Sequence, residues 1–562
     1  MNKVSVIPST GFVPGLYHRD IFHPWLQGLI LISGLLAIPV ICIFLSIFLD
    51  SGDVWTHLYE TVLGSYIVNS LALVSGVGFL VLILGTIPAW LITMYRFPGS
   101  KVLGWALLLP MAIPAYIIAY TYTGLLDVAG PLQMMLRETF AWQYGDYWFP
   151  DVRSLGGAIV MLSLVLYPYV YLLSRAAFIE QSICVLEVSR SLGCGPYRSF
   201  FKVGLPLARP AIIAGLSLVM METLADYGTV QYFGVATFTT GIFRTWFGLG
   251  SSVAAAQLAA VLLMFIMLVV LLEAWSRRQA RYHHTSNRYS KLVQSPLQGW
   301  PRLLAMMACI LPVAFGFLIP AVQLSLWASQ TWTEVVDRRF FALIGHSIEL
   351  AAIASIVALV LALFIAYGKR LLSNALTRFV VRLLGLGYAI PGTVVAVGVL
   401  IPFAWLDNSI DTWMRENMDM STGLLLSGTL FSLIFAYLVR FLPMSLNTVE
   451  AGLSKIRPAM DEVGRSMGLK AGAILTKVHV PMLKGSILTA ALLVFVDVLK
   501  ELPATLILRP FNFNTLAIRT YELANEERLA DAANPALAIV LVGIIPVIIL
   551  SRSISRSRPG HD

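Results

Sequence analysis

Four carboxylates interrupt long apolar stretches of this sequence, where an ionisable residue is costly and usually marks a route or a partner. Glu222 and Asp226 are four residues apart, a spacing that predicts one face of a helix. Asp497 and Glu501 repeat that spacing in the second half of the chain. Hard cations prefer oxygen ligands. With the phenol of Tyr227 as a further oxygen donor, the acids predict a path for a hydrated or chelated trivalent metal.

A path has to release what it carries, so we expect the four acids to make transient contacts and predict no stable metal site. Counted from Pro206 or Pro481, the first acid of each pair lies 16 residues into its helix. At about 1.5 Å per residue, that is roughly 24 Å from the cytoplasmic start, in the outer part of a membrane. The alternative is that the acids lie at helix ends in outer-surface water, or pair with Lys500, Arg244 and Arg519.

The chain also contains one polar, basic motif twice, 275 residues apart. Each copy has a glutamate, a glycine six residues later and a proline thirteen residues after the glycine: Glu187, Gly193 and Pro206, then Glu462, Gly468 and Pro481. A glycine after a helical run suits a C-terminal cap, because it accepts a positive φ. A proline suits the first turn of a helix, where its missing N–H costs little.

Each copy therefore predicts a helix, a glycine turn, a short cross helix along the membrane surface and then a spanning helix. An ordinary basic loop that follows membrane topology is the alternative for a single copy. Two copies at identical spacing favour a surface on which a partner docks.

The elements that position these residues are membrane helices. Of the 562 residues 58% are hydrophobic and 12% are charged, with a mean hydropathy of +0.80, whereas soluble domains carry about 25% charge. A spanning helix needs about 20 mostly apolar residues. Twelve stretches qualify, near residues 26–49, 66–94, 102–126, 155–174, 206–227, 253–273, 303–327, 346–368, 381–405, 422–442, 482–502 and 535–551.

Lysine and arginine gather in alternate loops, after the second, fourth, sixth, eighth and tenth of these stretches and at the end of the chain. The intervening loops carry fewer, with 328–345 as the one weak member. The positive-inside rule then predicts that both termini face the cytoplasm. The net charge of +9 is explained by these loops, and no nucleic-acid partner is predicted.

The two halves repeat each other. Ala112-Ile113-Pro114 matches Ala389-Ile390-Pro391, and several matched positions share the offset of 275: Phe238, Thr240, Arg244 and Thr245 with Phe513, Thr515, Arg519 and Thr520. An even number of spans per half makes the repeats parallel. We predict an all-α integral membrane protein of twelve transmembrane helices in two parallel six-helix repeats, 1–276 and 303–562, joined by a cytoplasmic linker, 277–302.

The repeated motif resembles the coupling loop of permease subunits of bacterial ABC importers: a glutamate, a glycine, nine residues and then Val/Ile-x-Leu/Val-Pro. The family's usual Glu-Ala-Ala opening is here Glu187-Val188-Ser189 and Glu462-Val463-Gly464, a departure that leaves the glutamate, glycine and proline in place. Two permease halves in one chain, with the run 500–517 and the related run 225–234, resemble the iron(III) branch of these importers.

That resemblance implies that each loop forms a helix that docks in a groove of an ATPase subunit. The ATPase-coupling residues would be Glu187, Gly193, Pro206, Glu462, Gly468 and Pro481. The implied partners are two copies of an ABC ATPase, a periplasmic iron-binding protein and membrane lipid. The implied location is the bacterial inner membrane, and the implied activity is ATP-driven import of iron(III) by alternating access.

The chain has no Gly-x-x-x-x-Gly-Lys-Ser/Thr phosphate loop, so we expect no cofactor in it, with ATP and magnesium bound by the separate ATPase. Importers of thiamine, polyamine or sulfate are alternatives within the class. A secondary transporter driven by an ion gradient shares the helix count but leaves the twin motifs unexplained. A membrane-embedded enzyme would need a His and Asp or Glu cluster at catalytic spacing, which the sequence does not supply.

Two lesser expectations concern the second half. Arg440 is expected at the inner end of its helix, where it can snorkel to the headgroups. The segment 503–534 is expected to be a charged outer loop that could contact a substrate-binding protein, or a solvated helix without a partner.

Overall fold

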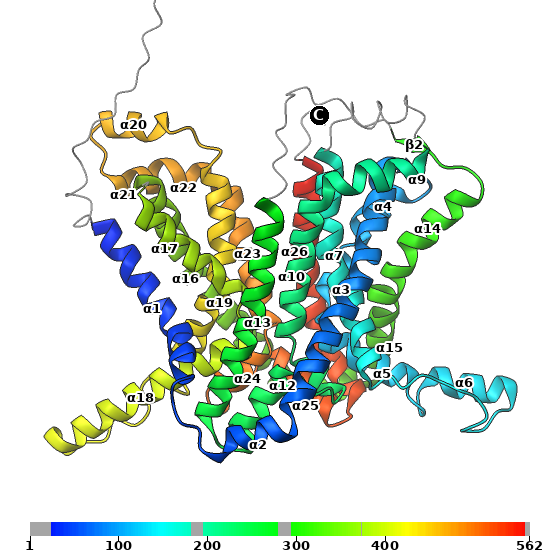
Figure 1. The fold of residues 1–562 in the computed structure, drawn as a ribbon, viewed down its shortest axis with the longest axis horizontal. Helices are drawn as coiled ribbons and strands as arrows, with labels where there is room; N and C mark the ends of the chain where they lie inside the picture. The colour runs from blue at the N-terminus through cyan, green and yellow to red at the C-terminus, as the bar shows by residue number, and fades with distance from the viewer. Residues whose placement is uncertain (1–23, 181–194, 279–293, 373, 557–562) are drawn as a thin grey trace, which may run out of the picture.

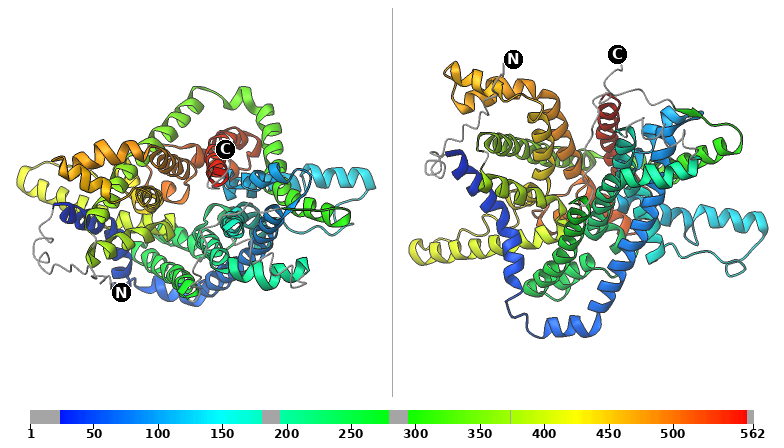
Figure 2. Two further views of the ribbon diagram at one scale, coloured as in Figure 1. Left: turned by 90° about the horizontal axis from the view of Figure 1, so that it is seen from above. Right: turned by 45° about the horizontal axis from the view of Figure 1, so that its top comes forward.

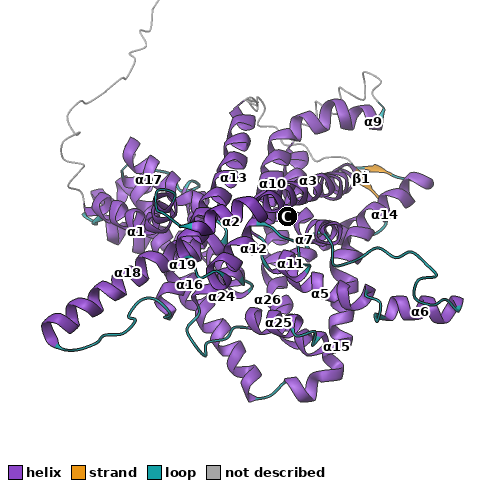
Figure 3. Ribbon diagram, turned by 60° about the horizontal axis from the view of Figure 1, so that its bottom comes forward, coloured by secondary structure: helices purple, strands orange, loops and turns teal. Residues whose placement is uncertain are grey.

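The computed structural model describes residues 24–180, 195–278, 294–372 and 374–556. Helices make up nearly all of this part of the chain, with loops and turns between them (Figure 3). Its one described strand pair is parallel and two residues long, β1 (Tyr95–Arg96) with β2 (Ser295–Pro296). Helices satisfy their own backbone hydrogen bonds, which is what a chain in lipid requires. The predicted all-α membrane class is confirmed.

The described helices of the first half, with 3-10 and π segments marked η, are α1 (Pro24–Ser46), α2 (Asp53–Thr61), α3 (Leu63–Met94), α4 (Ser100–Ala106), η1 (Leu109–Ala112), α5 (Ala115–Leu126), α6 (Pro131–Phe140), α7 (Leu155–Glu180), α9 (Pro196–Ser199), η2 (Phe200–Gly204), α10 (Leu205–Ala225), α11 (Gly228–Tyr232), α12 (Phe238–Phe243), η3 (Arg244–Gly248) and α13 (Ser252–Arg278).

Those of the second half are α14 (Trp300–Val313), η4 (Ala314–Leu318), α15 (Ile319–Val335), α16 (Arg338–Leu371), α17 (Ala375–Gly385), η5 (Leu386–Ala389), α18 (Gly392–Met418), α19 (Leu430–Leu453), α20 (Ala459–Ser466), α21 (Ala471–Ile474), η6 (Leu475–His479), α22 (Val480–Met482), α23 (Lys484–Leu499), α24 (Pro503–Leu508), α25 (Leu516–Asn525) and α26 (Leu529–Arg556).

Within the described residues, 10 helices are long and apolar enough to cross a membrane, or up to 12 if each of two bent pairs counts as one span. The bends are 92° between Ser100–Ala112 and Ala115–Phe140, and 84° between Ala471–Met482 and Lys484–Leu499. The twelve predicted stretches correspond to these helices, but the sequence did not predict the bends.

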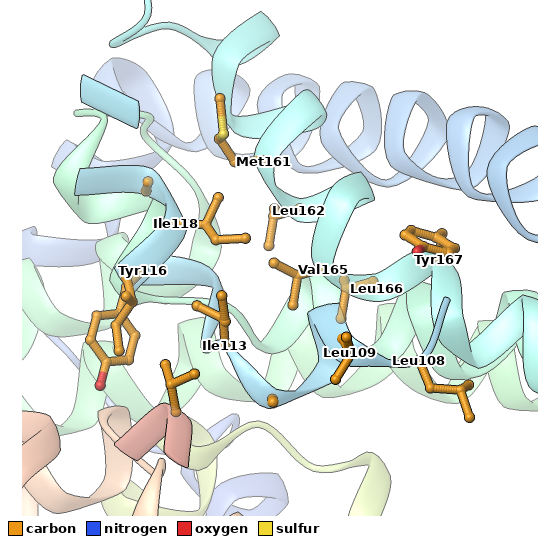
Figure 4. Packing of buried hydrophobic residues seen from close by; sticks show 14 of the residues in the cluster. Leu108, Leu109, Ile113, Tyr116, Ile118, Met161, Leu162, Val165, Leu166 and Tyr167 are labelled. Atoms are coloured by element: carbon orange, nitrogen blue, oxygen red, sulfur yellow. The ribbon is translucent and has the colours of Figure 1, made fainter. Parts of the chain in front are cut away.

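The repeated Ala-Ile-Pro sequence breaks the third predicted span of each half, where a continuous helix was expected. Ile113 and Ile390 are extended, with ψ of 119° and 125°, and the helix restarts after Pro114 and Pro391. A proline disfavours the helical conformation of the residue before it, which explains the break. The first break is packed tightly, because Leu109 and Ile113 lie against Leu162, Val165 and Leu166 of α7 (Figure 4).

The first helices of the two repeats pack against the opposite half (Figures 1 and 2). Helix α1 lies along α17 and α18, and its Leu29 and Ile43 are buried in the cluster that contains α16 and α19. Helix α14 packs against α3 and α4, and the hydroxyl of Tyr122 in α5 donates to the carbonyl of Phe315 at 2.6 Å. The two halves are therefore interlocked in space, and the division of the chain at 276 and 303 stays a prediction from sequence.

The fifth predicted span of each half is followed by a short helix that stays inside the protein. Helix α10 ends at Ala225 and α11 follows, while α23 ends at Leu499 and α24 follows. Most of α24 and of the later α25 is buried, and α25 packs on α26. The expected loop over 503–534 is therefore largely helical, with α24 and α25 mostly buried, while the turns at 511–512 and 525–528 are exposed.

Candidate functional site

A cavity of about 140 Å³ lies between the two halves, lined by η1, α5, α7, α10 and α11 from the first and by η5, α19, α23 and α24 from the second. This is about tenfold the space of about 10–15 Å³ that one water requires. Its lining brings together the five predicted path residues: Glu222, Asp226, Tyr227, Asp497 and Glu501.

The four acids do not share helical faces as their spacing predicted, because both helices end before the second acid. Asp226 is extended, with ψ of 130°, and its carboxylate accepts hydrogen bonds from the backbone of Thr229 and Val230 and from the Thr229 hydroxyl, all at 3.1 Å. Glu501 accepts one from the backbone of Ala504 at 3.1 Å. Each acid therefore caps the short helix that follows it.

Two cations share the cavity with the acids. Lys500 pairs with Asp497 at 2.7 Å, which agrees with the alternative that the sequence left open. Arg440 lies 3.2 Å from Glu501 and 3.9 Å from Glu222, and its side chain is only 8% exposed. The expectation that Arg440 snorkels to the inner headgroups was wrong. The sequence does contain a signal for this pairing, because an arginine inside an apolar run is an intramembrane charge, and such charges usually pair with acids.

Three further phenols that the sequence analysis missed line the same cavity: Tyr116, Tyr169 and Tyr388. The hydroxyl of Tyr116 is buried and has no hydrogen-bond partner among the described residues. Phenols inside a membrane protein are common and carry no spacing signal of their own. Only the packing of α5, α7 and η5 around the cavity identifies these three.

The second copy of the repeated motif forms a hairpin of short helices at the end of the molecule that also holds α9, which lies between Gly193 and Pro206 of the first copy (Figure 1). Glu462 lies exposed in α20, and Gly468 ends that helix with a φ of +79°, as predicted for a cap. Pro481 was predicted in the first turn of the spanning helix, but it lies in α22, a three-residue segment that precedes the 84° bend before α23.

In the first copy, Pro206 is in the first turn of α10. Glu187 and Gly193 lie outside the described residues.

A buried ion-pair network holds α20 against the helix bundle. The carboxylate of Asp461 contacts Arg370 at 2.7 Å and His479 at 2.7 Å. Arg370 also donates to the carbonyls of Leu453 and Ile456, at 2.7 and 3.0 Å, and so fixes the turn that enters α20. Burial alone would raise the pKa of Asp461, but the hydrogen bonds with His479 and Arg370 outweigh it and lower the pKa below its ordinary value.

The first half has no such charges at the matching positions. Gly204 stands where the offset of 275 places His479, and the ring of Trp90 packs so closely over it that a Cβ would lie 2.3 Å away. In the second half the ring of Tyr367 packs on His479, with centroids 5.3 Å apart. The sequence predicted twin motifs, and the structure adds that the second is anchored by charge.

Replacing Asp461 by asparagine should loosen α20, because it leaves Arg370 buried without its counter-charge, a loss of about 3 kcal/mol or more. Hydrogen exchange of 454–479 should rise while the rest of the bundle stays protected. Because the pKa of Asp461 is lowered, its contribution is complete at neutral pH and is lost only as the pH falls below about 4.

The matched control for this change is Glu450→Gln. It removes the more exposed pair with Lys369, and such pairs contribute about 0–1 kcal/mol. Equal exchange in the two variants would contradict the role given to Asp461.

Residues 81–281 and 358–558 each match the family described as binding-protein-dependent transport system inner membrane component. The Fe(3+)-transport system permease protein FbpB 2 of Haemophilus influenzae is 26% identical over 539 residues, which cover 94% of this chain and 98% of that protein.

Relatives whose names give other substrates match a shorter part of this chain. The molybdenum transport system permease protein ModB of Escherichia coli K12 is 25% identical over 229 residues, 40% of this chain and 95% of its own. The sulfate transport system permease protein CysT of Salmonella typhimurium is 28% identical over 211 residues, 35% of this chain and 72% of its own. The chain thus belongs to the family of binding-protein-dependent transport system inner membrane components, and it carries the family's permease unit twice.

Proposed function

We propose that this permease imports iron(III) across the bacterial inner membrane. The observation that carries the proposal is the match along nearly the whole two-repeat chain to an iron(III) transport permease, whereas the molybdenum and sulfate permeases match less than half of it. The cavity supports the same cargo class, since its carboxylates and phenols are oxygen donors that suit a hard trivalent cation.

The translocation path runs through the cavity between the halves, with Glu222, Asp226, Tyr227, Asp497 and Glu501 in its wall. Contacts with the cargo are transient, because a tight site would hold iron and stop transport. Rocking of the two halves exposes this route alternately to the two sides of the membrane.

The two repeated motifs dock two copies of an ABC ATPase, which binds ATP and magnesium and hydrolyses ATP. The exposed surface of α20, with Glu462 beside Val463 and Met467, supports this role for the second copy. The coupling residues are Glu187, Gly193 and Pro206 and their equivalents Glu462, Gly468 and Pro481. Both termini are cytoplasmic, and a periplasmic iron-binding protein delivers the cargo at the opposite end.

A deletion strain tests the cargo. It should grow poorly on iron-limited medium, normally on media limited in sulfate, molybdate, thiamine or polyamine, and recover when the chain is restored. Normal growth of the deletion strain on iron-limited medium, or a growth defect on one of the other limited media, would reassign the cargo. Iron uptake that continues after collapse of the proton gradient while ATP is present would separate this importer from a secondary transporter.

A further inference from the structure

The charges of the cavity are distributed unequally between the two halves. Both cations, Arg440 and Lys500, come from the second half. The offset of 275 places Val165 and Ala225 at the matching positions of the first half. Among the described lining residues, the first half thus contributes acid to the cavity and no cation.

The three acids other than Glu222 are already engaged within their own halves. Asp226 holds the first turn of α11, Asp497 pairs with Lys500 at 2.7 Å, and Glu501 pairs with Arg440 at 3.2 Å. The side chain of Glu222 is 22% exposed, against 12% for Asp497 and 6% for Glu501. Within the described residues its one ion pair is with Arg440, at 3.9 Å, and it is the longest in the cavity.

Phenol oxygens line the cavity that contains this acid. Tyr169 and Tyr388 line the cavity with it, and the buried hydroxyl of Tyr116 on the same lining lacks a partner among the described side chains. The two tyrosines are not equivalent in the repeats. Met444 of the second half matches Tyr169, and Met111 of the first half matches Tyr388. Carboxylate and phenol oxygens on one wall are the donors that a hard cation binds.

We propose that Arg440 is a resident counter-cation of the path, which sits between Glu501 and Glu222 when the path is empty and is displaced from Glu222 by a trivalent metal cation. The inference rests on the proposed import of iron and names how that cargo is held and released. Glu222 is then the acid that receives the cargo, and Arg440 is the internal competitor that keeps its binding weak.

The geometry favours exchange over a fixed bridge. Arg440 is anchored to Glu501 in its own half and reaches Glu222 only across the interface between the halves. Its Nε has no partner among the described residues, so the guanidinium is not fully held by its surroundings. A movement of the halves that lengthens the 3.9 Å contact frees Glu222, and one that shortens it expels the cargo.

Terbium(III) tests the exchange, since it is a hard trivalent cation whose luminescence is sensitised by nearby tyrosine. It is titrated into the transporter, chain and ATPase together, in lipid nanodiscs. Wild type should show weak saturable binding, which Glu222→Gln abolishes and Glu138→Gln, on exposed α6, leaves intact. Arg440→Gln should bind terbium about tenfold to hundredfold more tightly, because a positive charge beside the acid is gone.

Arg440→Lys provides a second reading if the glutamine variant does not fold. Its compact ammonium keeps the charge but bridges two carboxylates poorly, so terbium affinity should rise by only about threefold. Terbium affinity that is unchanged or weaker in the folded arginine variants, or unchanged in Glu222→Gln, would overturn the exchange while leaving iron uptake as the function. A growth test that reassigns the cargo would instead remove the function, whatever terbium does.

Discussion

Iron uptake is expected to fall at least about tenfold when Glu222 and Asp497 are both replaced by their amides, while the protein still assembles with its ATPase. The amides keep the size and hydrogen-bonding capacity of the side chains and remove two negative charges from the cavity wall. A tenfold effect corresponds to about 1.4 kcal/mol, which is modest for two charges in a site partly shielded from water. Uptake of radioactive iron by cells or proteoliposomes measures it.

The other two acids provide the contrast, since Asp226 and Glu501 cap α11 and α24. Asp226→Asn and Glu501→Gln should lower thermal stability, because each weakens a cap worth about 0.5–2 kcal/mol. The Glu222 amide should leave stability nearly unchanged, whereas the Asp497 amide should lower it, because Lys500 loses its partner at 2.7 Å. Unchanged uptake in the Glu222 and Asp497 double variant would show that these acids do not line the path.

Much of the architecture follows from the sequence because lipid leaves few choices. Apolar runs of about 20 residues must form helices there, and a motif repeated at a constant offset identifies the two halves. Gly468 was predicted as a cap because a residue with positive φ at a helix end is usually glycine. These are local rules, and the described structure follows them.

What the sequence analysis missed depends on contacts between distant segments. Nothing local says that α1 packs against α17 and α18, since lipid and protein are equally apolar neighbours. The prediction for Arg440 considered its position along one helix, whereas its partners are Glu222 in α10 and Glu501 in the turn after α23. The breaks before Pro114 and Pro391 have a local signal, since each proline disfavours the helical conformation of the isoleucine before it.

The cavity acids include one correct prediction and one wrong one. The pairs were found because charge is rare in apolar runs, but their shared helical face was wrong, because Asp226 and Glu501 lie beyond the helix ends. Asp226 precedes Gly228 and Thr229, a sequence that suits a capped turn as well as a continuing helix. Spacing alone does not distinguish a capped turn from a continuing helix. The hydrogen bonds from the short helices to Asp226 and Glu501 determine which one forms.

Charge reversal at the repeated glutamates is the second large effect. Glu462→Lys should reduce iron uptake by more than about tenfold, because it replaces an acid on the exposed surface of α20 by a cation where the ATPase is proposed to dock. The helix itself should survive, since an acid in its first turn contributes only about 0.3–1 kcal/mol. Uptake and ATP hydrolysis by the reconstituted transporter are measured together, and loss of uptake with retained hydrolysis identifies uncoupling.

Glu416→Lys is the matched control, an exposed reversal on α18 at the other end of the molecule. A compensating reversal on the ATPase should restore uptake in Glu462→Lys, and failure of every such pair would place the contact elsewhere.

Glu187→Lys should have the same effect if the two motifs work as equals. Among the described residues, the network of Asp461, Arg370 and His479 has no counterpart in the first half, where Trp90 packs on Gly204 at the position that matches His479. If the halves are unequal for this reason, Glu462→Lys should impair uptake more than Glu187→Lys, and Asp461→Asn should remove the difference between them.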